Sequence, residues 1–222
     1  MSNPKGTIFL IGILLFVVKA FPQVNDAGTW LSVNLSKDFS QAVGLNFSQE
    51  VRIMENYSEV MTIFSDLGLE YRFNKHLKAS LNYRFLNDKR LDDTYSGKNR
   101  FYMDLSYRQK VKPFLVTVRE RFQSQFSEPY SSGDNNPELT ARTKAALKLD
   151  LKFKVSPYIS FEGFTPLNTP GSRLLPKTRY ACGMEYDFAP RQMLDLSFLV
   201  QSSNSSVPAR DYVVCLGYSL KL

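Results

Sequence analysis

The sequence predicts an all-β protein, an antiparallel transmembrane β-barrel with a polar, charged lumen and about 10 strands, or 12 as the alternative. Three observations predict this fold: long runs of alternating apolar and polar residues, an N-terminal segment typical of secretory signal peptides, and connections that alternate between short and long. Residues 139–155 show the alternation most clearly, because apolar and charged residues take turns from Leu147 to Val155. This run is far longer than a usual globular strand of about 5 or 6 residues.

A basic amphipathic helix is the competing interpretation of the same run. Lys144, Lys148 and Lys152 are spaced four apart, as on one helix face. At about 100° per residue, however, the apolar residues between 147 and 155 would scatter over both faces of a helix. The alternation therefore favours a strand with one apolar and one charged face.

Residues 1–23 are typical of a secretory signal peptide. Lys5 precedes an apolar run over 8–18, and Lys19-Ala20-Phe21-Pro22-Gln23 follows it. The run is too short for a spanning helix of about 20 residues, although an uncleaved anchor is the alternative. Residues 24–222 are then expected to form a single barrel domain, and membrane insertion must be by strands.

The charge of the chain does not indicate a nucleic-acid partner. The 28 basic and 21 acidic residues give a net charge of +7, with one His. The basic residues occur one at a time within alternating segments, which is typical of solvated strand faces rather than of a basic patch.

Ten alternating segments besides residues 139–155 are predicted strands. They are residues 29–37, 43–53, 61–73, 77–85, 101–108, 114–123, 158–162, 178–188, 194–200 and 212–222. Within residues 114–123, Glu120 is out of phase, which indicates a bulge or a site near the membrane rim. Ser156-Pro157 is expected to close a tight turn.

Short and long connections alternate along these segments, as they do in outer-membrane barrels. Eleven segments conflict with closure by antiparallel pairs, which requires an even number. Ten strands beginning at Gln41 would close, and the Trp30 segment would then lie in the lumen or at the rim. Twelve strands, with one unrecognised, are the alternative.

The chain resembles the outer-membrane β-barrel family catalogued as domain of unknown function 2490. The motifs that carry this resemblance are Trp30, Gln49-Glu50-Val51-Arg52, Tyr71-Arg72-Phe73, Tyr83-Arg84-Phe85, Arg119-Glu120-Arg121-Phe122 and Pro157-Tyr158-Ile159-Ser160-Phe161-Glu162. The resemblance covers nearly the whole chain after residue 23. It implies a barrel in the outer membrane of Gram-negative cells, and it implies no activity and no functional residues.

Charged residues on the polar side of the strands are expected to line the lumen. The candidates are Glu50, Arg52, Glu70, Arg72, Arg84, Arg108, Arg119, Arg121, Lys148, Lys152, Glu162 and Glu185, together with Asp66, Asp104, Asp150 and Asp187. In a narrow barrel such side chains can cross the lumen as ion pairs. Alternatively, Arg119, Arg121, Lys148 and Lys152 can line a passage for small anionic solutes.

Enzymatic chemistry finds little support in the sequence. The one His, His76, falls in a predicted periplasmic turn, so a Ser-His hydrolase that modifies lipids is not expected. Cys182 and Cys215 are predicted on opposite strand faces, which argues against a disulfide. A carboxylate pair of Glu162 and Glu185 for glycoside chemistry is explained equally well by ion pairing.

Three functional classes follow: a structural or scaffold barrel with an ion-paired lumen, which the sequence favours, a narrow anion pore as the alternative and, less favoured, a lipid-modifying enzyme. The sequence predicts no cofactor or metal. The expected partners are the lipid bilayer of the outer membrane and, for the long polar loops, lipopolysaccharide.

Overall fold

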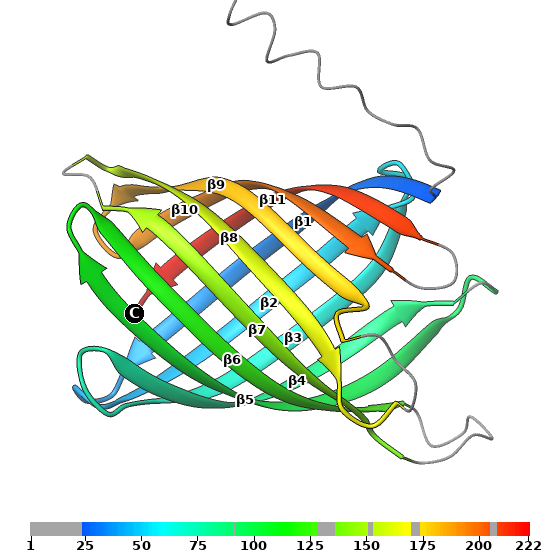
Figure 1. The fold of residues 1–222 in the computed structure, drawn as a ribbon, viewed down its shortest axis with the longest axis horizontal. Coiled ribbons are helices and arrows are strands. Elements are labelled where there is room, and N and C mark those ends of the chain that lie inside the picture. The colour runs from blue at the N-terminus through cyan, green and yellow to red at the C-terminus, as the bar shows by residue number, and fades with distance from the viewer. Residues whose placement is uncertain (1–23, 91, 128–135, 151–152, 170–173, 205–207) are drawn as a thin grey trace, which may run out of the picture.

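The computed structural model describes residues 24–90, 92–127, 136–150, 153–169, 174–204 and 208–222, which form a closed barrel of eleven strands (Figure 1). The predicted signal peptide, residues 1–23, lies outside the described residues. The described part contains no helix that is long and apolar enough to cross a membrane. The strands are β1 (Val24–Asp38), β2 (Val43–Met54), β3 (Glu59–Arg72), β4 (Leu77–Lys89), β5 (Tyr95–Val111), β6 (Phe114–Ser127), β7 (Glu138–Leu149), β8 (Val155–Pro166), β9 (Lys177–Ala189), β10 (Gln192–Ser203) and β11 (Ala209–Lys221).

The expected counts of 10 and 12 strands are both wrong, and the Trp30 segment is not an extra piece. It forms β1, which pairs antiparallel with β2 and parallel with β11, from Val24 opposite Ala209 to Ser36 opposite Lys221. All other neighbours are antiparallel and consecutive in sequence. Parallel pairing also satisfies the backbone groups of both edges, so an odd number of strands can close.

The two faces of the barrel wall differ sharply in polarity. Large apolar side chains point outward, and Leu81 and Phe101 are 64% and 53% exposed. The buried inner side chains include many charged ones, such as Asp66, Arg84 and Arg121. A water-soluble barrel would bury its apolar face instead, whereas an apolar outer wall around a polar interior suits a barrel surrounded by lipid.

Connections of different length gather at the two rims of the barrel. The short-turn rim carries residues 39–42, 73–76, 112–113, 150–154 and 190–191 between strands. The long-loop rim carries the connections 55–58, 90–94, 128–137, 167–176 and 204–208. Since β1 runs from the long-loop rim toward the short-turn rim, the odd-numbered strands all share this direction, and β11 ends at the short-turn rim (Figure 1).

The run 139–155 is not one continuous strand. β7 ends at Leu149, and Val155 already belongs to β8, in which Ser156 and Pro157 lie within the strand. The Asp150 N–H donates to the carbonyl of Pro113 at 2.7 Å, and Lys110 forms an ion pair with the Asp150 carboxylate. The hydrogen bond from Lys110 holds the pKa of Asp150 below its usual range. The alternation therefore continues through a connection, which the sequence pattern alone does not reveal.

Glu120 lies neither at a bulge nor at a rim. The pairing of β6 with β5 and with β7 continues without a register shift, with Glu120 opposite Leu105 on one side and Thr143 on the other. Glu120 therefore points outward from the middle of β6, between Val118 and Phe122. The break in the alternation is a carboxyl on the apolar wall.

Candidate functional site

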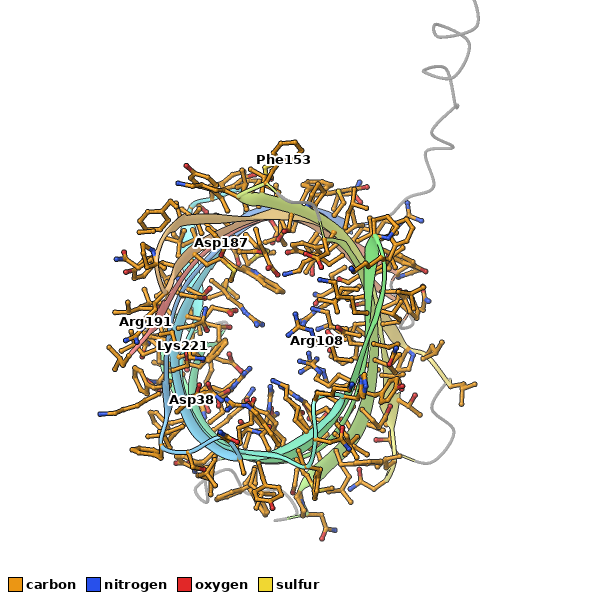
Figure 2. The ribbon with its side chains drawn as sticks, turned by 90° about the vertical axis from the view of Figure 1, so that its left-hand side faces the viewer. Asp38, Arg108, Phe153, Asp187, Arg191 and Lys221 are labelled. Atoms are coloured by element: carbon orange, nitrogen blue, oxygen red, sulfur yellow. The ribbon has the colours of Figure 1, made fainter. Side chains whose placement is uncertain are left out.

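The lumen contains the charged side chains that the alternation places on the inner face. Eleven of the twelve predicted lining residues from Glu50 to Glu185 lie on described strands. They occupy the inward-facing positions of the alternation, like the buried residues Asp66, Arg84 and Arg121. The twelfth, Lys152, lies outside the described residues. Figure 2 looks along the barrel from the short-turn rim and shows Arg108 pointing inward and Phe153 pointing away from the barrel. In this view, the drawn side chains surround a clear centre.

Arginines and aromatic rings contact one another along the inner wall and form what we call the arginine–aromatic belt. The guanidinium carbon of Arg52 lies 3.9 Å from the ring centre of Trp30 and 5.1 Å from that of Phe64. The belt consists of Trp30, Arg52, Phe64, Arg84, Tyr102, Arg121, Arg142, Phe164 and Arg179, from β1 to β9. Arg179 also lies 4.9 Å from the Trp30 ring, so the contacts run from Arg142 on β7 past β9 and β1 to Arg121 on β6. Among the described residues, no ring contact joins Arg121 to Arg142, its neighbour in the β6–β7 register.

Carboxylates fix three arginines of the belt. Glu50 binds Arg52, and Asp66 binds Arg84, each at 2.6 Å. Asp104 forms two hydrogen bonds with Arg121, of 2.6 and 2.7 Å. A planar guanidinium held by a carboxylate and stacked on a ring is strongly oriented, so these three arginines are well ordered and each is balanced by its carboxylate. Arg100 on β5, in the same part of the wall, hydrogen-bonds to Gln125 instead.

The opposite part of the wall carries an excess of positive charge. Glu162 on β8 accepts contacts from Arg119 at 2.6 Å, Arg142 at 2.9 Å and Arg179 at 3.6 Å. Lys144 stands opposite Glu162 in the β7–β8 register, and Lys177 lies over Phe164 at 5.5 Å. Neither lysine forms an ion pair within the described part of the chain. These six residues, Arg119, Arg142, Lys144, Glu162, Lys177 and Arg179, are called the Glu162 cluster, with five cations and one carboxylate.

Three buried donors of the lumen lack hydrogen-bond partners among the described residues. They are the indole Nε1 of Trp30 and the Nε atoms of Arg119 and Arg142. Buried donors are normally satisfied by protein or by water. Two of the three belong to the Glu162 cluster, so the positively charged wall also contains buried N–H groups without an acceptor among the described residues.

A cavity of about 1000 Å³ occupies the short-turn side of the lumen. Its wall includes Arg108, Arg119, Lys144 and Lys148. Lys148 binds Glu185 at 2.6 Å, and Arg72 and Lys78 bind Glu70 at 2.9 and 2.7 Å. The wall of the cavity therefore contains both ion-paired residues and part of the Glu162 cluster, because Arg119 and Lys144 of that cluster line the cavity.

The structure does not bring the carboxylates of Glu162 and Glu185 together. Glu162 lies opposite Arg179 in the β8–β9 register, and Glu185 is six residues further along β9. At about 3.3 Å per residue this spacing far exceeds the separation of about 5 to 9.5 Å in glycosidases. His76 contacts the carbonyl of Arg108 at 2.9 Å in a turn. Cys182 and Cys215 are free, on the outer and inner faces respectively.

The sequence analysis missed the aromatic half of the belt and four cations of the Glu162 cluster. Trp30, Phe64, Tyr102 and Phe164 occupy inward positions that the alternation assigns to polar residues. The signal was present, because each of these aromatic residues breaks the pattern of its strand. Arg142, Lys144 and Arg179 have the inward parity but lie toward the ends of the predicted strands, and Lys177 lies just before the predicted strand 178–188.

Comparisons with known proteins agree with this architecture. The structure is similar to a solved structure of the NanC porin, with 12% identity and a TM-score of 0.53, over 89% of this chain and 99% of that one. It is also similar to LpxR from Salmonella typhimurium, with 9% identity and a TM-score of 0.50, over 81% and 83% of the two chains. At these identities the likeness shows a shared fold, that of outer-membrane β-barrels. No curated protein matches the sequence.

The family itself is shown by the sequence. Residues 27–212, most of the chain from β1 to β11, match the family described as protein of unknown function (DUF2490). The resemblance expected from the short motifs is confirmed, and this chain belongs to the DUF2490 family.

Proposed function

We propose that the protein spans the outer membrane of a Gram-negative cell and forms a narrow pore for small anionic solutes. The apolar outer wall and the shared fold support the membrane location. The observation that carries the anion preference is the Glu162 cluster, in which five cations share one carboxylate.

The charge distribution gives a physical basis for selectivity. Charges that line a channel with low-dielectric walls act strongly on ions within it, and basic rings favour anions. Arg119 and Lys144 lie both in the cluster and in the wall of the cavity. An anion that enters from the short-turn rim therefore meets Lys144, which forms no ion pair among the described residues, and Arg119, which shares Glu162 with Arg142 and Arg179.

The test is the single-channel current of the refolded mature chain in planar bilayers, measured under a salt gradient. We expect a steady current whose reversal potential indicates anion preference. Lys144→Glu should reduce or reverse this preference, whereas Lys112→Glu, a change at an exposed turn residue outside the cavity wall, is the matched control and should leave it nearly unchanged. A folded and inserted protein that conducts no current would refute the pore.

A structural barrel is the second candidate, and the arginine–aromatic belt favours it. The belt joins nine strands through ring contacts and ion pairs, which can hold the wall together without any transport. This candidate predicts that the inserted protein conducts no current and that substitution of a belt residue destabilises the barrel. We propose no catalytic role, because His76 lies in a turn and contacts a backbone carbonyl.

A further inference from the structure

A carboxyl interrupts the apolar outer wall on β6. Phe114, Val116, Val118 and Phe122 point outward on the same strand. Oε2 of Glu120 accepts a hydrogen bond of 2.7 Å from the Thr143 hydroxyl on β7. Within the described part of the chain, the other carboxyl oxygen has no hydrogen-bond partner.

The strand register places Glu120 midway between the two rims. In one direction the row of paired residues runs from Glu120 through Leu105, Ala79 and Tyr71 to Val43, the first residue of β2 at the short-turn rim. In the other direction it runs through Thr143, Gly163 and Thr178 to Ser202, near the end of β10 at the long-loop rim. The strands are tilted against the barrel axis (Figure 1), so a row of paired residues climbs or descends as it passes from strand to strand. Each of the two rows reaches its rim after four strands, and Glu120 therefore lies halfway between the rims.

A polar group at this height needs a polar partner. Hydrocarbon offers neither donors nor acceptors, so an acyl chain leaves the free oxygen of Glu120 unsatisfied at a cost in free energy. The same group is satisfied if another protein surface covers it. Glu120 therefore favours a protein partner over lipid on this face.

The neighbouring side chains allow a close approach. The outward residues of β7 around Thr143 are Ala141 and Ala145, and all three are small. Much of the remaining wall carries exposed Leu, Phe and Tyr side chains, for example Leu81 and Phe101. Small residues that flank a hydrogen-bonding group are typical of contacts between membrane-spanning segments.

We propose that this surface, Glu120 with Ala141, Thr143 and Ala145, is where a second copy of the chain docks. Two copies inserted in the same orientation are related by a two-fold axis along the membrane normal, so residues at equal height meet their own counterparts. The Thr143 hydroxyl lies beside the Glu120 carboxyl in each copy, so each copy brings both a donor and an acceptor to the contact. This inference rests on the proposed membrane location and is independent of the pore.

The first test counts photobleaching steps of the mature chain in phosphatidylethanolamine–phosphatidylglycerol vesicles at decreasing protein density. The fluorophore is attached to Lys75→Cys in a Cys182→Ser, Cys215→Ser background. Glu120→Leu should weaken dimerisation about tenfold, the size expected for the loss of paired hydrogen bonds in a membrane. Gln49→Leu is the matched control, because Gln49 also points outward and accepts from Ser65 at 2.5 Å, but on the wall formed by β2 and β3.

The second test is disulfide cross-linking in the same vesicles. Thr143→Cys should give a covalent dimer under mild oxidation, and Val33→Cys, on the outer face of β1, should not. Flotation of the vesicles and heat-modifiable migration on gels establish insertion and folding separately, so failure of the membrane location is distinguishable from failure of the dimer. The proposal is overturned if the inserted protein stays monomeric, or if both cysteine variants cross-link equally.

Discussion

Replacing Glu162 by Gln should destabilise the barrel more than any other single loss of a lumen carboxylate. The change removes the one negative charge among Arg119, Arg142 and Arg179, whose side chains are 23%, 8% and 11% exposed. Leaving buried charges without their partner typically costs about 3 to 5 kcal/mol. Because the lumen admits some water beside Arg119, we expect the lower end of that range, about 3 kcal/mol.

Glu185→Gln is the matched control, because Glu185 forms one ion pair with Lys148, and both side chains are about a quarter exposed. Ion pairs with such access to water contribute about 0.2 to 1 kcal/mol. Urea unfolding in detergent micelles, followed by the fluorescence of the single tryptophan, Trp30, measures both variants. Equal losses of unfolding free energy in the two variants would show that the Glu162 cluster is not held by its carboxylate.

Three further predictions concern the belt, the packing and the orientation of the barrel. Arg52→Ala removes the guanidinium that lies 3.9 Å from the Trp30 ring, so it should shift the fluorescence emission maximum of Trp30, whereas Arg108→Ala should not. An unchanged emission spectrum in Arg52→Ala would contradict the contact between Arg52 and Trp30. Gly28→Ala places a methyl group 2.2 Å from the backbone oxygen of Ile53 and should cost about 2 kcal/mol in the same urea assay. Gly68→Ala meets the mobile end of Asn82 instead and should cost less, so the reverse order would argue against the register. On intact cells, a cysteine-specific impermeant dye should label Asp92→Cys at the long-loop rim and leave Lys75→Cys unlabelled.

The alternation of apolar and polar residues predicted the fold class. A barrel with an apolar outer wall and a polar lumen requires this alternation in every strand, so the local sequence pattern is sufficient to indicate it. The alternation also predicted the inward direction of Arg84 and Arg121, which follows from strand parity alone. The ion-pair partners of these residues depend on the register between neighbouring strands. The alternation within one strand does not determine that register. For the same reason, the run 147–155 gave no sign of the connection after Leu149.

The strand count shows a different limit. Residues 29–37 were recognised as a strand, but the rule that antiparallel neighbours close in pairs excluded them from the barrel. The parallel contact of β1 with β11 joins residues almost a whole chain apart, from Val24 with Ala209 onward. No local feature of either strand indicates such a partner, since both show the same alternation as the rest.

The contact between β1 and β11 also determines the order in which the barrel can assemble. The other ten contacts between neighbouring strands join segments that are consecutive in sequence, so each can form as a local hairpin. The β1–β11 contact alone must close a loop that contains nearly all of the chain, which is slow because of the entropy lost. We therefore expect the sheet to grow as an open, curved ribbon whose two free edges meet last. Until they meet, those edges are the part of the folding protein most exposed to pairing with another chain.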